Sequence, residues 1–537
     1  MAAATQSHHQ FAQSKAFWLI IQAGLITLAA YYLTSRALPD RMDADLIVGT
    51  MAGQHNLTLF FWGQDRLANL TALLISPIRE IRAALYFYTL FQALYFSGLI
   101  YLISRLIHTQ RTLRLVSFAL TILVAANWIP EREIFTFAKH AQPYAASTLF
   151  TLGAYCLPRV KQHPWGITLC RLGMLVTALL LNPLSGFLAL TLPLASLLCS
   201  RSGTRRYSIN GILHWLAVLL AAGLVCQKIQ ATYRQQMRLS ATPLALEPNL
   251  IPEGLSTAWD RLMDSYGEHE WALALLIIAT LYALARWLWA IRRQDNNENI
   301  NAIIGLAISL NTLSMLVIAS SSWVESFGFP LRYFFPIYLL ALTATAQAIG
   351  DLTRKMFDLS KRWPRQRQRV NTILATIGLT AVITIFGLHG QTLIPEITSY
   401  REIARAKPVF DFFAETTNPP PFVGGHFGLS WALYAYSIDQ KKPIPTLSGR
   451  SDFDPMSAAQ RVLLEQRIRR QEPFDYYCLQ SKPHDLSACD KWLRQKLNDQ
   501  SPGQNWIIRK HQVLHTQTQH KKTTTIHRLR TLPLPQT

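Results

Sequence analysis

Long apolar stretches recur along this chain and constrain its fold more than any other feature. About eleven runs reach the roughly 17 to 23 residues that cross the hydrocarbon core of a bilayer. Half of the residues are apolar and only 15% are charged, whereas about 25% are charged in a typical soluble domain. The sequence therefore predicts a polytopic α-helical membrane protein with about eleven transmembrane helices. The predicted spans begin near Ala16, Ala83, Leu115, Tyr144, Gly166, Leu184, Gly211, Trp271, Asn301, Tyr333 and Asn371.

Two of these stretches allow alternative interpretations. The apolar region from Gly166 to Ser200 is interrupted at Asn182-Pro183, which fits either two short helices or one long re-entrant hairpin. The first run, from Ala16 to Ser35, is either a signal peptide or a spanning helix. Its apolar run is longer than that of a typical signal peptide, which favours an uncleaved helix.

Lysine and arginine concentrate in every second loop between the predicted spans. Because basic residues of short loops stay in the cytoplasm, this alternation predicts a cytoplasmic N-terminus and an extracytoplasmic C-terminus. The net charge of +21 is then a signal for topology and for anionic membrane lipids, and a nucleic-acid partner is not expected. The basic loops hold Arg105, Arg111 and Arg114; Arg159 and Lys161; Arg201, Arg205 and Arg206; Arg292 and Arg293; and Arg354 to Arg369.

The composition becomes polar from about Gln391 onward. We therefore expect two domains: a transmembrane domain over residues 1–391, whose first outer loop covers 36–81, and an extracytoplasmic domain over 392–537. Apolar stretches alternate there with helical patterns, which predicts a small α/β fold. The expected helices lie near 408–415, 429–438, 455–469 and 486–497, and the expected strands near 422–424, 444–447, 474–479, 506–517 and 523–529.

Two of the six cysteines lie in this C-terminal domain. Cys478 and Cys489 are an isolated pair in a compartment that we expect to be oxidising, so the sequence predicts a structural disulfide between them. The other four cysteines lie in predicted spans and have no metal-ligand spacing.

Three carboxylates stand where the first predicted helix leaves the membrane. Asp40, Asp43 and Asp45 directly follow the apolar run, and ionisable groups at a membrane boundary are candidates for function by default. The alternative is that they are solvated loop acids that mark a helix end. Asp40 precedes Arg41 and fits a simple ion pair with it.

Two segments resemble bacterial members of the GT-C membrane glycosyltransferases, the relatives of protein mannosyltransferases and lipid A aminoarabinose transferases. The first is FFWGQDRLANLTALLISPI, from Phe60 to Ile78, which follows the acid-bearing loop. The second is SSSWVESFGFPLRYFFPIYLL, from Ser320 to Leu340, where Arg332-Tyr333 precede Pro336 as in the family's late RY…P segment. The family's usual Asp-Glu pair of the first loop is spaced here as Asp43-Ala44-Asp45.

The resemblance implies transfer of a sugar from a polyprenyl-phosphate donor to a glycan, lipid or protein acceptor. The transfer would take place on the outer face of the bacterial inner (plasma) membrane. Such a transfer needs a base for the acceptor hydroxyl, and partial burial raises a carboxylate's pKa toward the working pH. Asp43 is the first candidate for this catalytic base and Asp45 the second. No cofactor is implied.

Arg332 is the candidate for the lipid phosphate that leaves. A guanidinium presents a planar fork that matches phosphate oxygens, and it meets the charge that grows on the leaving group. The alternative is a snorkelling arginine that anchors a helix end beside Tyr333, the other expected substrate contact. Gln64 and Arg66 are further candidates for phosphate or sugar contacts, against the alternative that they cap a short interfacial helix.

A second outer cluster follows the third predicted helix. It holds Glu131 and Glu133 and, before the next span, Lys139 and His140. The family often has an acidic residue in this loop, so Glu131 and His140 are candidates for substrate binding, with ordinary loop solvation as the alternative.

Glu268, His269 and Glu270 have side chains of the kinds that bind divalent cations. Three consecutive residues cannot all face one ion without a sharp turn. We therefore assign no metal site.

Two other classes of function compete with the enzyme. A transporter of envelope lipids or glycans would show related halves and charges at mid-membrane, whereas Arg171 is the clearest such charge and no internal repeat is apparent. A noncatalytic assembly or scaffold protein can use the same helical fold. Neither class needs Asp43, Asp45 and Arg332 together.

Overall fold

The structure is a computed structural model that divides into two compact units. The first comprises residues 1–36, 90–234 and 240–390, and the second comprises 37–89, 235–239 and 391–537. The second unit therefore joins the first outer loop to the C-terminal segment, which are far apart in sequence. The described residues are 18–35, 44–55, 57–61, 68–138, 143–157, 164–199, 209–237, 245–293, 299–361, 394, 396–416, 422–447, 455–480, 486–502, 504–517 and 523–534.

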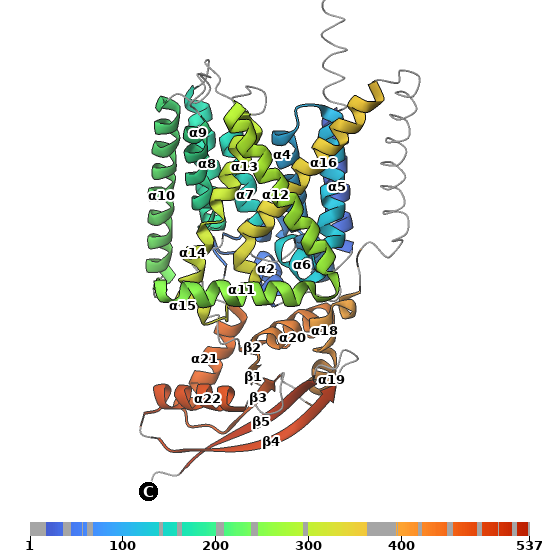
Figure 1. Ribbon diagram of the computed structural model, residues 1–537. Coiled ribbons are helices and arrows are strands. Elements are labelled where there is room, and N and C mark those ends of the chain that lie inside the picture. Colours follow the sequence, from blue (N-terminus) through green and yellow to red (C-terminus); the bar gives the residue numbers. More distant parts are fainter. Residues whose placement is uncertain are drawn as a thin grey trace, which may run out of the picture. The chain divides into compact units, whose positions relative to one another are not determined.

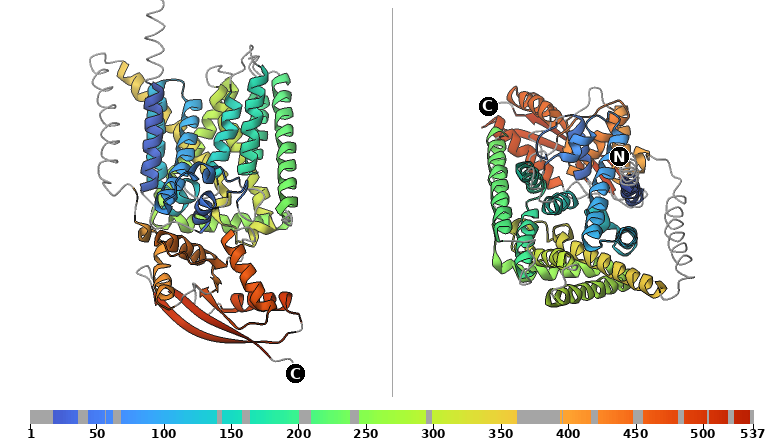
Figure 2. Two further views of the ribbon diagram at one scale, coloured as in Figure 1. Left: turned by 180° about the vertical axis from the view of Figure 1, so that it is seen from behind. Right: turned by 90° about the horizontal axis from the view of Figure 1, so that it is seen from above.

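The first unit is helical, and we call it the helical unit. Its longer helices run side by side, and α11 lies across one of their ends (Figures 1 and 2). Besides the helix Trp18–Ser35, the described helices are α4 (Ile81–Ile107, which begins in the second unit), α5 (Arg111–Trp128), α6 (Glu131–Ala138), α7 (Tyr144–Cys156), α8 (Pro164–Leu181), α9 (Ser185–Cys199), α10 (Ile209–Met237), η2 (Pro248–Leu250), α11 (Ile251–Tyr266), η3 (Gly267–His269), α12 (Glu270–Arg293), α13 (Asn299–Asn311), α14 (Ser314–Ala319), α15 (Ser322–Glu325), η4 (Leu331–Phe334) and α16 (Phe335–Lys361).

Six described helices are long and apolar enough to cross a membrane, so the chain is a membrane protein. They are Trp18–Ser35, Ile81–Ile107, Ile209–Gln236, Glu270–Arg292, Ile300–Ala319 and Leu331–Met356. The apolar helices α8 and α9 are shorter. They are separated at Asn182, whose Oδ1 accepts a hydrogen bond from the backbone N–H of Leu184 at 3.0 Å. The interruption at Asn182-Pro183 is thus a turn between two short helices. The expected span near Asn371 lies outside the described residues.

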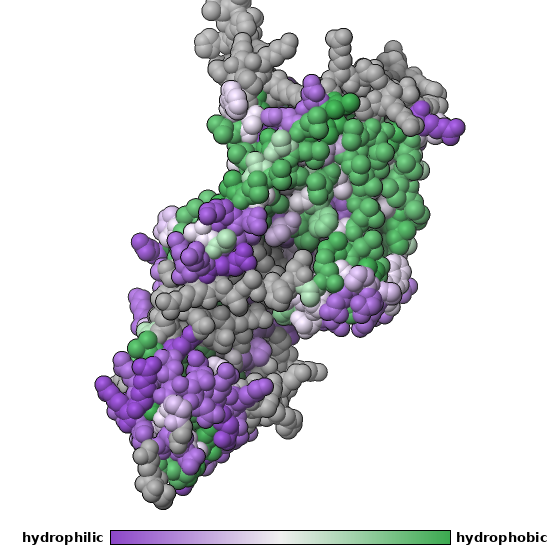
Figure 3. Space-filling model, turned by 90° about the vertical axis from the view of Figure 1, so that its left-hand side faces the viewer, coloured by the Kyte–Doolittle hydropathy of each residue, from purple (hydrophilic) through white to green (hydrophobic). Residues whose placement is uncertain are grey.

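Leucines on the outer face of the helical unit show which solvent it meets. In α10, Leu213, Leu216, Leu220 and Leu224 are exposed at a spacing of three to four residues, which is one face of a helix. Figure 3 shows the wide hydrophobic surface of the helical unit from one side. Such a surface is stable against lipid tails and not against water.

The second unit contains a mixed five-stranded sheet with the strand order β2-β1-β3-β5-β4. β1 pairs in parallel with β2 and β3, whereas β5 is antiparallel to both β3 and β4. Its elements are α2 (Ala44–Gln54), α3 (Leu70–Ile75), η5 (Ile397–Ser399), α18 (Arg401–Ala404), α19 (Lys407–Thr416), β1 (Phe422–Gly425), α20 (Phe427–Asp439), β2 (Thr446–Leu447), α21 (Pro455–Arg469), β3 (Phe474–Gln480), α22 (Leu486–Gln500), β4 (Trp506–Gln517) and β5 (Thr523–Pro533).

Alternation along β3 assigns the helices to the two faces of the sheet, because successive strand residues point to opposite faces. Tyr476 stacks on Trp492 of α22, with ring centroids 5.5 Å apart. Its neighbour Tyr477 meets Phe413 of α19 edge to face at 5.2 Å. α22 therefore covers one face and α19 the other.

Candidate functional site

The acid-bearing first loop leads directly into α2 of the second unit. Asp40 and Asp43 lie outside the described residues, whereas Asp45 lies half-buried in the first turn of α2. A carboxylate at a helix start is stabilised by the unpaired N–H groups of that end. Of the two acids predicted as the base, the structure thus describes Asp45, and places it at a helix N-terminus.

α2 packs against α20 within the same unit. A Cβ placed on Gly428 would lie 3.6 Å from the Cβ of Ala44, so the first turns of the two helices meet. At the other end of α2, Nε2 of His55 lies 3.4 Å from the hydroxyl of Tyr434. The residues next to Asp45 therefore border the start of α20, although some 380 residues of sequence separate the two segments.

The glycine-rich segment before α20 is a turn from strand to helix. Gly425 has φ of 121°, a conformation that side chains rarely permit. His426 caps the helix, because its Nδ1 accepts the N–H of Leu429 at 3.3 Å, and its own N–H donates to the carbonyl of Leu479 at 2.8 Å. The segment has the geometry of a capped helix start beside the acid-bearing end of α2.

Gln64 and Arg66 lie outside the described residues, but the chain on either side of them is described. Phe60 and Ala68 form an antiparallel bridge. The Asn69 side chain donates from Nδ2 to the carbonyls of Phe60, at 2.7 Å, and Thr58, at 3.0 Å. Asn69 thus holds together the two ends of the GQDR segment.

Arg332 lies in η4, immediately before α16 of the helical unit. Its guanidinium lies over the ring of Tyr333, 5.0 Å from the centroid, and Nη2 donates to the Tyr333 hydroxyl at 3.2 Å. The ring of Tyr333 is buried and meets Trp323 edge to face at 5.4 Å. Phe327 adds a second ring 6.0 Å from the guanidinium. Arg332 is therefore oriented by aromatic rings, which hold its guanidinium in one place.

The second outer cluster contains a buried carboxylate. In α6, Glu131 is exposed, whereas Glu133 is 3% exposed and accepts a hydrogen bond from the hydroxyl of Ser265 at 3.3 Å. Burial, and then the Glu133 carboxylate, raise the pKa of the neighbouring Tyr266 phenol. His140 lies outside the described residues. The sequence analysis named Glu131 as the candidate of this loop, whereas the buried carboxylate of the structure is that of Glu133.

The helical register of α6 contained the signal for this difference. Glu133 lies four residues before Phe137, whose ring packs 4.4 Å from that of Tyr338 in α16. Residues four apart share one face of a helix, so Glu133 follows Phe137 into the interior while Glu131 does not. A carboxylate packed beside phenol groups can accept protons and hydrogen bonds from a polar ligand.

The described residues contain no group of three or more His, Cys, Asp and Glu side chains that could hold a metal ion. In the segment Glu268-His269-Glu270, His269 ends η3 and Glu270 begins α12.

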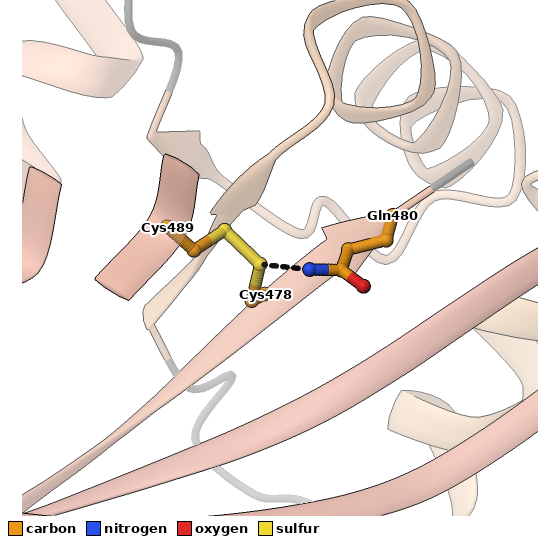
Figure 4. The surroundings of a disulfide bond; sticks show 3 residues. All are labelled: Cys478, Gln480 and Cys489. Carbon is orange, nitrogen blue, oxygen red and sulfur yellow. Dashed lines mark hydrogen bonds between the residues drawn. A yellow bond between two sulfur atoms is a disulfide. The ribbon is translucent and has the colours of Figure 1, made fainter. Parts of the chain in front are cut away.

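A disulfide joins β3 to α22 in the second unit. It connects Cys478 with Cys489 and fixes α22 against the sheet (Figure 4). Gln480, two residues along the same strand, donates from Nε2 to the Cys478 sulfur at 3.6 Å.

Comparisons with known proteins found similarity in structure and none in sequence. No family model matches the chain. No curated protein matches it. Among solved structures, the chain is similar to the crystal structure of ArnT from Cupriavidus metallidurans bound to undecaprenyl phosphate, with 10% sequence identity and a TM-score of 0.43. The match covers 95% of this chain and 98% of that one.

Proposed function

We propose that this chain is an integral membrane glycosyltransferase of the GT-C type. It would move a sugar from a polyprenyl-phosphate donor to a cell-envelope acceptor on the outer face of the bacterial inner membrane. The observation that supports this most is the burial of Glu133, because the resembled family often has an acid in this loop and a buried carboxylate is costly unless a role retains it.

The proposed base is Asp43, with Asp45 as the alternative. The acceptor hydroxyl attacks the anomeric carbon of the donor sugar, and the bond from that carbon to the phosphate oxygen breaks. The base takes the proton of the acceptor hydroxyl, and the lipid phosphate leaves with the bonding electrons. Asp45 lies at the start of α2, so both acids precede or begin the same helix.

The departing lipid phosphate requires a fixed positive charge, and we assign it to Arg332. Its guanidinium is held over Tyr333, which preorganises the cation before the phosphate arrives. Arg66 and Gln64 are proposed as further donor contacts. Glu131 and His140 remain proposed substrate contacts, and we add Glu133 because of its burial.

The domain at 392–537 is proposed to be extracytoplasmic and to take part in acceptor recognition. A reporter that is active only outside the cytoplasm should then be active when fused after Thr537 and silent after Lys361. Activity after Lys361 alone would reverse the orientation and place the acids on the wrong side of the membrane.

The catalytic proposal is tested in a strain that lacks the protein, by measuring surface glycans and lipid-linked sugars. Asp43→Asn keeps the size of the side chain and removes its basicity, so glycan synthesis should fall about a hundredfold or more. Arg332→Ala should lower synthesis and also weaken donor binding, because the phosphate contact exists before the transfer. Asp40→Asn, three residues from Asp43, is the matched control and should leave synthesis near normal.

The alternative of a noncatalytic scaffold or a transporter predicts a different pattern. If Asp43→Asn, Asp45→Asn and Arg332→Ala all restore full synthesis at normal expression, the outer acids carry no chemistry. The lipid-linked sugar should also accumulate in the knockout if transfer is the missing step, whereas loss of a scaffold would deplete several glycans together.

A further inference from the structure

A polar cavity in the helical unit lies far from the residues assigned to the reaction. It lies between α12, α13 and α16 and is lined by Arg286, Trp287, Ala290, Asn301, Ala302, Gln347, Asp351 and Arg354. Asp351 follows Arg332 by nineteen residues. At a rise of 1.5 Å per residue this separation is about 28 Å along the helix, which approaches the thickness of a hydrocarbon core. The cavity therefore lies near the opposite membrane boundary from Arg332.

A hydrogen-bond network fixes the one carboxylate among these lining residues. Oδ2 of Asp351 accepts hydrogen bonds from Nε2 of Gln347 at 2.8 Å and from the hydroxyl of Tyr282 at 3.1 Å. Nε of Arg286 lies 3.7 Å from the same oxygen. Asp351 is thus already satisfied by two donors and one cation, and it orients Arg286 at the cavity wall.

The wall behind this network is tightly packed. Nε1 of Trp287 donates to Oε1 of Gln347 at 3.3 Å, so the amide bridges the indole and the carboxylate. Glycine is required at 305 in α13, because a Cβ there would overlap the Trp287 ring. This packing fixes the Trp287 side of the cavity, which lowers the entropic cost of holding a ligand against it.

The charge of the lining favours an anion. The lining holds two guanidinium groups, Arg286 and Arg354, and one carboxylate, and its remaining polar residues are uncharged. The same end of α12 carries Arg292 and Arg293 in addition. A guanidinium fork binds two oxygens of a phosphate at once, which an ammonium cannot do.

Exposed apolar side chains on the same two helices favour a lipid as the source of the anion. Leu288 and Trp289 of α12 are 60% and 51% exposed, and Leu352 of α16 is 62% exposed. Each is next to a lining residue in sequence but lies on another face of its helix, which gives acyl chains a surface to pack on. A ligand with a phosphate at the cavity and hydrocarbon along these helices is a phospholipid.

We propose that this cavity binds the phosphate headgroup of an anionic phospholipid, as a site separate from the donor lipid of the reaction. It secures the ends of α12 and α16 that lie opposite Arg332. The proposal does not depend on the proposed enzymatic activity, and its test measures binding alone.

The test uses the full chain purified in a detergent with a neutral headgroup. Dioleoylphosphatidylglycerol should raise the unfolding temperature more than dioleoylphosphatidylcholine, and native mass spectrometry should show a retained lipid. Arg354→Gln should weaken phosphatidylglycerol binding about tenfold, the loss expected for one charge-assisted contact. Lys355→Gln removes the same charge from the next, exposed residue and should leave binding unchanged.

A second variant separates guanidinium geometry from net charge. The double substitution Arg286→Gln with Asp351→Asn removes both members of an ion pair, so the net charge is unchanged and no buried charge is left alone. Lipid binding should still fall about tenfold, because the fork is lost.

Three outcomes would overturn the proposal. Equal stabilisation by the two lipids would show that no anion site exists. Equal losses in Arg354→Gln and Lys355→Gln would reduce the effect to general surface charge. Stabilisation by inorganic phosphate alone, lost in the lining variants, with none by phosphatidylglycerol, would replace the lipid by a free anion as the occupant.

Discussion

The two units share one way of satisfying polar side chains and differ in another. Buried hydroxyls of both donate to backbone carbonyls of their own helices. Thr151 of the helical unit bonds to the carbonyl of Ser147 at 2.9 Å, and Thr50 of the second unit bonds to that of Leu46 at 3.0 Å. Strands of the second unit are also joined by charged side chains at the surface. Arg528 meets Asp475 at 2.7 Å between neighbouring strands.

This difference follows from what surrounds each unit. No water is present in hydrocarbon to solvate a polar group, so a hydroxyl there uses the nearest carbonyl. A charged pair at an aqueous surface costs little and contributes little. Buried charges in the helical unit are therefore the exceptions to be explained, and Glu133 and Asp351 are two of them. They led to the proposed active site and the proposed lipid site respectively.

The sharpest test of this comparison is to neutralise Glu133. Glu133→Gln keeps the shape and removes the charge, and we expect glycan synthesis to fall at least about tenfold, because a carboxylate that binds substrate or protons is lost. The measurement is complementation of the knockout strain at matched expression. Glu253→Gln, at an exposed position of α11, is the control and should complement fully. Equal activity of both variants would make Glu133 a structural residue.

The loss of an ion pair should change the free energy of unfolding more in the helical unit than in the second unit. Asp351→Asn leaves Arg286 without its charged partner, and we expect a loss of about 2 to 3 kcal/mol, below the range for fully buried pairs because Arg286 is partly exposed. Asp475→Asn breaks the Arg528 pair in the second unit and should cost less than about 1 kcal/mol. Thermal unfolding of the purified variants measures both. A larger effect at Asp475 would reverse the comparison.

The second unit contains a disulfide, and we expect part of its stability to depend on that covalent link. Replacing Cys478 and Cys489 with Ser should destabilise the sheet and α22 by about 2 to 3 kcal/mol, since a bridge over a loop of this length mainly limits the unfolded chain. Hydrogen exchange of β3 and α22 is the readout, and Cys170→Ser in α8 is the control. Thiol labelling of the denatured, unreduced protein should modify Cys170 and spare both members of the pair.

The smallest expected effect is a pH dependence of the sheet. Burial lowers the pKa of His527 in β5 below its usual value near 6.5. The unfolded chain therefore binds a proton before the folded chain does, so stability is full above about pH 6.5 and declines as the pH falls below it. After correction for the pH dependence of intrinsic exchange, the free energy of protection of β5 amides should decrease on mild acidification by less than about 1 kcal/mol. His527→Gln should flatten this dependence. His511→Gln, on the exposed part of β4, should not.

Local patterns in the sequence predicted most of the elements but not their partners. The helix Pro455–Arg469 and the strand Trp506–Gln517 lie where alternation and helical spacing place them. Packing between α2 and α20 has no such signature, because no periodicity names a partner several hundred residues away. Asp351 also escaped notice, since its place in the basic end of an apolar span resembles ordinary charge at a helix end.

Because the second unit joins segments that are far apart in sequence, its parts become available for folding at different times during translation. α2 leaves the ribosome early, with Leu46, Ile47 and Met51 ready to be buried, whereas α20 follows several hundred residues later. At about 5 to 20 residues per second, the delay is tens of seconds. During this time the apolar face of α2 lacks α20, so the nascent chain is open to misfolding and to chaperones. The second unit is completed only after β5, the last described strand of its sheet, has been translated.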